Sequence, residues 1–278
     1  MRPLPILYSA HHCSAHFGEF GSRSTLSAEQ RKRLSDCGTD LTVPLHGKAI
    51  LASYSRGIID LNRPVGHLDL FRATDFADPP NRIWHPWQEP TPQEQGDIIR
   101  RIYQPYHDRL LQCLQELSKG QQPVIVVAWD NMGRYPLRGD GSPRPGLTVP
   151  IILSNCGKKG STDQDEQQQE LPSCNPALLL ALAEEFRHAL LARGFPLDIA
   201  NGIHFNLPGF KGGYVCEHYT TLRHPDLPVA ATVQSLQVEY DAALTHDLRT
   251  LQTNYSAISR LQQAFSSAME RAYANLLS

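Results

Sequence analysis

The sequence predicts an α/β fold with a mostly parallel or mixed central sheet and helices on both faces. Short apolar runs of strand length alternate with longer segments of helical period, which is the pattern of a sheet built from strand–helix–strand units. The run PVIVVAW (123–129) is apolar throughout, as expected for a strand buried on both faces of a sheet. A chain of 278 residues can form one large domain, and we predict a single domain over residues 1–278.

Strands are predicted where apolar runs are bounded by turn residues. LPILYSA (4–10) is the first strand and leads into a histidine-rich loop. KAILASYS and RGIIDLN (48–62) follow as neighbouring strands, and PVIVVAW comes next. Three later runs, VPIILSN, GIHFNL and SLQVEY, complete the predicted sheet at residues 149–155, 202–207 and 235–240.

Helices are predicted from capping residues and from apolar positions at helical spacing. Ser27 caps SAEQRKRLS as a short surface helix. Residues 91–120 form a long amphipathic helix that should kink or break at Pro105. The segment 175–194 has Asn at its N-cap, Pro at the first helical position and Gly after the last turn, and a final helix is predicted over 257–277.

Composition narrows the class of partner. The 26 Lys and Arg residues nearly balance the 28 Asp and Glu residues, which disfavours nucleic acid and anionic membranes and favours a small substrate. No apolar run reaches 18 residues, and the N-terminal apolar run is too short for a signal peptide. The six cysteines form no C-x-x-C motif, so we predict a reduced, cytoplasmic protein. The polar segment 156–176 is predicted to be mobile, and nothing in the sequence indicates an oligomeric state.

Polar residues gather where the predicted strands end. In a parallel sheet the ligand site lies outside the carboxyl ends of the strands, so these residues share one expected location. The candidates are His11, His12, His16 and Glu19 after the first strand, Asp60, Asn62 and Arg63 in DLNRP, Asp130 and Asn131 after VIVVAW, and Glu239 in SLQVEY. Histidine together with carboxylates is typical of a catalytic zinc site, although an Asp60–Arg63 pair and a structural Glu239 are simpler alternatives.

The glycine pair in NLPGFKGGYVCEHY (206–219) allows close approach of the backbone to a ligand. This loop is predicted either to hold the substrate, with His218 and Tyr219 turned inward, or to form a tight hairpin with Lys211 in solvent.

Three motifs carry a resemblance to a known family. SRGIIDLNRP, GFKGGYVCEHY and SLQVEY, in this order after a histidine loop, resemble the N-formylglutamate amidohydrolases, bacterial enzymes of histidine breakdown that are related in fold to zinc carboxypeptidases. The similarity extends from the first strand to about His246. It implies a single zinc-exopeptidase-like domain that hydrolyses the amide bond of an N-acyl amino acid or a similar small carboxylate.

The resemblance also implies roles for single residues. His12 would bind the metal in the position of the family's Pro-His-Ser-Gly loop, with Glu19 as second ligand and His16 or Asp40 as alternatives. Glu239 would activate water, and Arg56 would polarise the scissile carbonyl. The substrate-binding residues would be Asn62, Arg63, Gly213, Tyr214 and His218.

Two positions depart from the family pattern. AWDNM stands where the family has Asp-x-His-Ser, so Asp130 replaces the expected histidine ligand. Its carboxylate suits zinc but also manganese, iron or magnesium. Glu217 stands where the family has an arginine, which argues against formylglutamate itself as the substrate. A non-catalytic ligand-binding protein and a peptidase or peptidoglycan amidase remain as alternatives.

Overall fold

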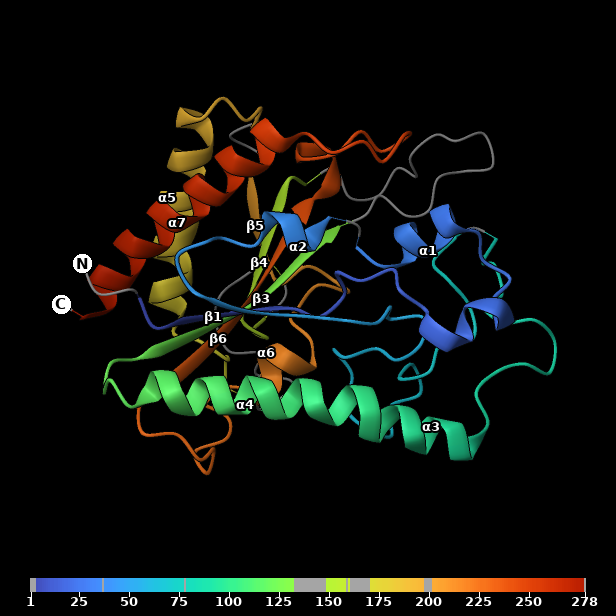
Figure 1. Cartoon of the computed structure of the whole chain (residues 1–278). Coiled ribbons are helices and arrows are strands. Elements are labelled where there is room, and N and C mark those ends of the chain that lie inside the picture. The colour runs from blue at the N-terminus through green and yellow to red at the C-terminus, as the bar shows by residue number, and fades with distance from the viewer. Residues whose placement is uncertain are drawn as a thin grey trace.

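The structure is a computed structural model that describes residues 4–36, 38–77, 79–132, 149–158, 160, 171–197 and 202–277. Its described strands form one sheet of six in the order β2-β1-β3-β6-β4-β5 (Figure 1). The strands are β1 (Ile6–Ala10), β2 (Lys48–Leu51), β3 (Val124–Met132), β4 (Ile151–Ser154), β5 (Ile203–Phe205) and β6 (Val233–Asp241). The first four in this order are mutually parallel, whereas β4 runs antiparallel to β6 and parallel to β5. The predicted fold class is therefore confirmed.

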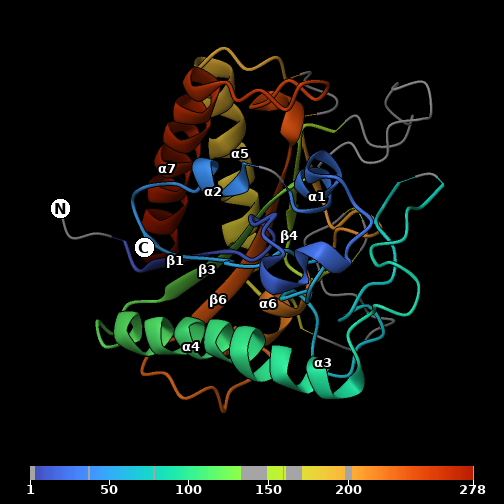
Figure 2. The ribbon, with the colours of Figure 1, turned by 45° about the vertical axis from the view of Figure 1, so that its right-hand side comes forward.

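Helices cover both faces of the sheet (Figure 2). They are α1 (Ala28–Leu34), α2 (Thr39–Thr42), α3 (Pro92–Ile98), α4 (Gln104–Ser118), α5 (Pro176–Ala192), α6 (Tyr214–His218) and α7 (Tyr255–Leu277). The helices α5 and α7 pack together on one face, and α3, α4 and α6 lie on the other. Alternate residues of β3 point to opposite faces, so Val127 packs in the α5–α7 core while Val126 packs in the α4 core. None of the described helices is long and apolar enough to cross a membrane.

The long helix predicted over 91–120 is interrupted, as Pro105 suggested. A π-helical turn, η2 (Ile99–Tyr103), separates α3 from α4, and the Gln104 N–H donates to the carbonyl of Ile99 instead of the carbonyl four residues back. The break lies next to Pro105 because proline has no N–H and its ring clashes with the carbonyl four residues earlier.

The prediction of a strand over RGIIDLN was wrong. Residues 56–62 form buried turns, in which the Ile58 N–H donates to the Ser55 carbonyl and the Arg63 N–H donates to the Asp60 carbonyl. The Asp60 side chain stabilises the second turn by accepting the Asn62 N–H at 3.0 Å. A continuous apolar run fits a buried turn as well as a buried strand, so periodicity alone misassigned the segment.

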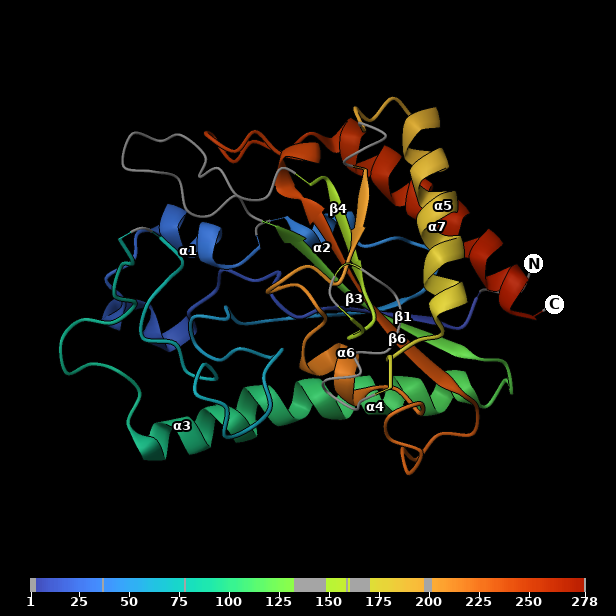
Figure 3. The same cartoon turned by 180° about the vertical axis from the view of Figure 1, so that it is seen from behind.

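The predicted mobile segment 156–176 falls partly outside the described residues, which omit 159 and 161–170. Of its described part, Cys156, Ser173 and Cys174 are buried, and Asn175 caps α5 through the Ala177 N–H. The carboxyl ends of β1, β3 and β6 lie at one edge of the sheet, and Figure 3 shows from behind that α1 and α3 lie beyond that edge.

Candidate active site

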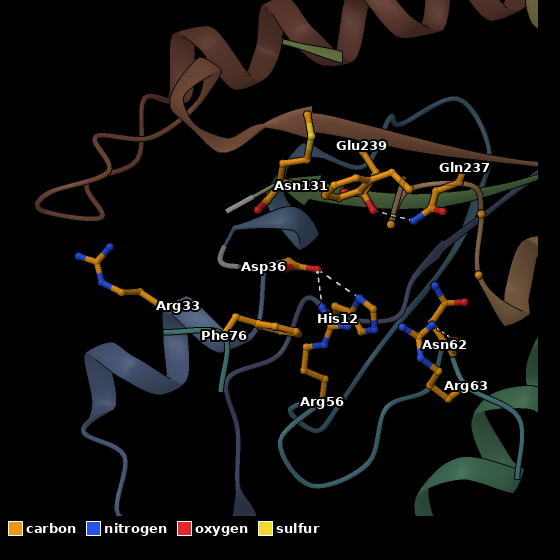
Figure 4. Close-up of a pocket in the computed structure, with 15 residues that line it drawn as sticks. His12, Arg33, Asp36, Arg56, Asn62, Arg63, Phe76, Asn131, Gln237 and Glu239 are labelled. Atoms are coloured by element: carbon orange, nitrogen blue, oxygen red, sulfur yellow. Dashed lines mark hydrogen bonds and ion pairs between the residues drawn. The ribbon is translucent and has the colours of Figure 1, made fainter. Parts of the chain in front are cut away.

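A cavity of about 250 Å³ opens at the carboxyl edge of the sheet (Figure 4). Polar side chains make up one part of its lining, including His12, Asp36 and Glu239. Its other walls carry the apolar side chains of Phe76, Met132 and Phe210 and the glycine pair of the GGY loop. The cavity therefore combines acid–base groups with a small apolar pocket, as substrate sites commonly do.

The centre of the site is a cluster of two histidines and an aspartate. His11, His12 and Asp130 bring one potential ligand atom each within 4.8 Å of the others, and all three are buried. His11 Nε2 lies 2.7 Å from Asp130 Oδ2, and His12 Nδ1 lies 3.6 Å from Asp130 Oδ1. Asp36 joins the cluster from the segment after α1, with its Oδ2 3.2 Å from His12 Nδ1.

The charge on Asp60 is paired, which explains an acid in a buried apolar run. Its Oδ1 lies 2.8 Å from His12 Nε2, and its Oδ2 accepts a hydrogen bond from Arg56 Nη2 at 3.0 Å. Burial raises the pKa of Asp60, but Arg56 and His12 outweigh burial and hold the pKa well below its usual value. Arg56 also lies 3.5 Å from Asp36 Oδ2, so this guanidinium connects two carboxylates of the site.

The cluster is suited to a metal ion. Both carboxylate oxygens of Asp130 and Nε2 of His11 are buried and have no well-aligned hydrogen bond among the described residues. Burial and Arg56 lower the pKa of His12, but Asp60 and Asp130 more than offset this and raise it well above its usual value. The carboxylates thus favour a positive charge at this point, and imidazole with carboxylate oxygens is a donor set for zinc, manganese or iron.

Glu239 lies on β6 beside Asp130 in the strand register. Its Oε1 accepts a hydrogen bond from Gln237 Nε2 at 2.6 Å, and both residues line the cavity. Burial, with the negative charges of Asp130 and Asp36, raises the pKa of Glu239 well above its usual value. A carboxyl group with a raised pKa holds a proton more readily than an ordinary carboxyl group, which suits a residue that takes up and releases a proton during a reaction.

Arg63 and Asn62 form the opposite wall. Asn62 Oδ1 accepts the Val215 N–H at 2.9 Å, and a Cβ on Gly213 would lie only 2.2 Å from Asn62 Nδ2. Arg63 donates to the Asn62 carbonyl at 3.1 Å and has no acidic partner among the described residues. Asn62 therefore holds the glycine loop in place, while the Arg63 guanidinium is available to an anion.

The structure does not bring every predicted residue to the site. Glu19 is exposed in the 3-10 helix η1 (Gly18–Arg23) and pairs with Arg101 at 2.9 Å, so it lies apart from the cluster although it shares a loop with His12. The two alternatives, His16 and Asp40, are exposed as well.

Tyr214 and His218 stack on each other in α6, with ring centroids 4.8 Å apart, and do not line the cavity. Tyr219 is buried against His107, whose Nδ1 lies 2.8 Å from its hydroxyl oxygen.

Sequence reasoning missed Asp36 and Gln237. Asp36 follows a helix, so a search at strand ends could not find it. Gln237 did carry a signal, because it lies two residues before Glu239 and so faces the same side of a strand.

The fold and the site together define an α/β protein whose cavity, at the carboxyl edge of the sheet, is lined by acid–base groups and arginines. This is the arrangement of a small-molecule hydrolase. A model of the N-formylglutamate amidohydrolase family matches residues 4–256. The chain belongs to this family, which confirms the resemblance seen in the sequence and indicates an amidohydrolase.

Solved structures share the fold. The crystal structure of N-formylglutamate amidohydrolase from Ralstonia eutropha JMP134 has a TM-score of 0.68 and 19% identity, over 97% of this chain and 93% of that one. The gene product Atu2144 from Agrobacterium tumefaciens has a TM-score of 0.63 and 16% identity, over 99% of this chain and 92% of that one. No curated protein matches the sequence significantly.

Proposed function

We propose that the protein is a metal-dependent amidohydrolase that cleaves the amide bond of an N-acyl amino acid or a similar small carboxylate. The observation that carries this proposal is that His12 and Asp36 line the cavity and meet the buried Asp130 beside it. The same cavity is lined by Glu239 and by Arg63, whose guanidinium has no acidic partner among the described residues. A volume of about 250 Å³ suits a small acyl amino acid better than a longer peptide.

The ligands we assign are His12, Asp36 and Asp130. His12 and Asp36 line the cavity, and Asp130 lies buried next to His12, with neither of its carboxylate oxygens hydrogen-bonded within the described residues. Asp36 thus replaces Glu19 as the second ligand. A zinc, manganese, iron or magnesium ion held there would act as a Lewis acid on the amide carbonyl.

The remaining side chains bind the substrate and move the proton. Glu239 accepts a proton from the attacking water and then delivers it to the leaving amine. Arg63 binds the substrate carboxylate, a partner that suits the planar guanidinium group. Arg56 contacts both Asp60 and Asp36. These contacts favour a role for Arg56 in positioning the two carboxylates, rather than the predicted role of polarising the scissile carbonyl.

The proposal is tested with Glu239→Gln, because glutamine keeps the shape of the side chain but cannot take up the proton. Turnover of N-acyl amino acids should fall by about a hundredfold to ten-thousandfold while the metal content stays the same. The control is Glu217→Gln, which removes an exposed carboxylate on α6. Full activity in Glu239→Gln would remove Glu239 from the mechanism, and wild-type protein that binds no divalent ion would refute metal dependence.

A further inference from the structure

The π-helical turn η2 sets a tyrosine hydroxyl against the wall of the cavity that carries Arg63. Tyr103 is the last residue of η2, and its hydroxyl donates a hydrogen bond to the Arg63 carbonyl at 2.9 Å. Tyr103 is buried, and its ring packs against the ring of His107 with centroids 4.2 Å apart. The tyrosine is therefore held firmly, and its hydroxyl joins the helix layer to the DLNRP segment.

The π-helical turn is what brings Tyr103 to this place. The buried side chains of α4 repeat every three or four residues, at Tyr106, Leu110 and Leu114. Ile98 and Tyr103, by contrast, are both buried in the core on this face although they are five residues apart. A regular α-helix with 3.6 residues per turn would place two such residues on different sides, whereas a π-turn accommodates one extra residue and brings them into line.

The backbone of Arg63 is hydrogen-bonded on both sides of the residue. The Arg63 N–H donates to the Asp60 carbonyl at 3.1 Å, and the preceding carbonyl, that of Asn62, accepts the Tyr214 N–H at 3.3 Å. The carbonyl of Arg63 itself accepts the Tyr103 hydroxyl. The guanidinium folds back onto this backbone, because its Nη1 donates to the Asn62 carbonyl at 3.1 Å. Its position thus depends on two peptide groups, one held by α6 and the other by η2.

This guanidinium is the group that the proposed function assigns to the substrate carboxylate. Arg63 lines the cavity, and its buried Nε has no hydrogen-bond partner among the described residues. A charged group that is already fixed in its binding direction loses less conformational freedom when the ligand binds, so it binds more tightly. Removing the Tyr103 hydroxyl would release one of the two peptide groups beside Arg63.

We propose that Tyr103 is a positioning residue, which holds the backbone of Arg63 so that the guanidinium is directed at the carboxylate of the substrate. The inference rests on the proposed function, since it concerns the arginine that binds this carboxylate. It gives the π-helical turn a role in substrate binding, and it separates that role from the chemical step.

The first test is steady-state kinetics of the metal-loaded enzyme with the N-acyl amino acid that it hydrolyses fastest and with the matching carboxamide. Tyr103→Phe removes only the hydroxyl, and it should raise KM for the carboxylate substrate by about three- to tenfold with little change in kcat, because one hydrogen bond to the Arg63 backbone is lost. KM for the carboxamide should stay the same. In a protein that already carries Arg63→Met, Tyr103→Phe should raise KM no further, because the two residues act through one interaction.

Tyr273→Phe is the matched control, because it also removes the hydroxyl of a buried tyrosine that donates to a backbone carbonyl, here that of Pro123 at 2.7 Å. Tyr273 belongs to the core on the opposite face of the sheet from Tyr103. KM of this variant should equal that of the wild type. A folded Tyr103→Phe protein with wild-type KM would overturn the proposal, and so would an equal rise in KM for both substrates.

The second test does not depend on turnover. Nitrogen-15 relaxation of the Arg63 Nε–H group, assigned with Arg63→Met, measures how rigidly the guanidinium is held in the metal-free protein without substrate. The order parameter of this group should fall in Tyr103→Phe and keep its wild-type value in Tyr273→Phe. An unchanged order parameter in Tyr103→Phe would overturn the proposal. Wild-type protein that hydrolyses no N-acyl amino acid would refute the proposed function, while this measurement would still decide whether Tyr103 positions Arg63.

Discussion

Replacing Gly213 with alanine should destabilise the protein even though the backbone there suits any residue. Gly213 has φ −131° and ψ −167°, an extended conformation, so the cost arises from contacts alone. A Cβ would lie 2.2 Å from Asn62 Nδ2 and 2.6 Å from Asn62 Cγ, and Asn62 is buried and tied to the Val215 N–H at 2.9 Å. Overpacking costs about 1–3 kcal/mol and a lost hydrogen bond about 1 kcal/mol, so the free energy of unfolding should fall by about 2–4 kcal/mol.

Urea denaturation measures this change, and Gly96→Ala provides the control. Gly96 lies in α3 with no atom within 4 Å of its added Cβ, so alanine there should raise the free energy of unfolding by about 0.5–1 kcal/mol. The two variants add the same methyl group and are expected to have opposite effects. Gly213→Ala with wild-type stability would refute the claim that Asn62 fixes the glycine loop.

Three further predictions concern binding and stability. Arg63→Met should raise KM for a substrate with a carboxylate by about ten- to a hundredfold with little change in kcat, because a hydrogen bond to a charged group contributes about 1.5–3 kcal/mol. Steady-state kinetics measure this change. An equal rise in KM for the matching carboxamide substrate would contradict the prediction. Asp36→Asn should lose bound metal by elemental analysis whereas Asp40→Asn, on the exposed side of α2, should keep it. Burial lowers the pKa of His46 from 6.5 to about 4, so the unfolded chain takes up its proton first and stability should fall as the pH drops from 6.5 to 4. The Tm of the wild type should decline more over this range than that of His46→Gln, and parallel curves would contradict the assignment.

Most of the sheet was predictable because its strands contain short apolar runs bounded by turn residues. The nine residues of β3 and the nine of β6 are all buried, and such runs can only lie inside a layered fold. Helix boundaries were equally accessible, since Ser27 and Asn175 are capping residues whose hydrogen bonds are local. The strand prediction for residues 56–62 was wrong because the conformation of this segment does not depend on the local sequence alone. It depends on the hydrogen bonds of the Asp60 side chain and on packing against residues distant in the sequence.

The amino-acid sequence by itself determined which chemical groups are present and predicted that several of them lie at one edge of the sheet. His12, Asp130 and Glu239 follow or end buried strands, and parallel strands carry such residues to one edge of a sheet. Only the tertiary structure decided which neighbours complete the site. It brings Asp36 to His12 and sets His11 behind Asp130, and it leaves Glu19 on the surface with Arg101. These pairings depend on how separate segments pack in three dimensions, and distance along the chain carries no information about that packing.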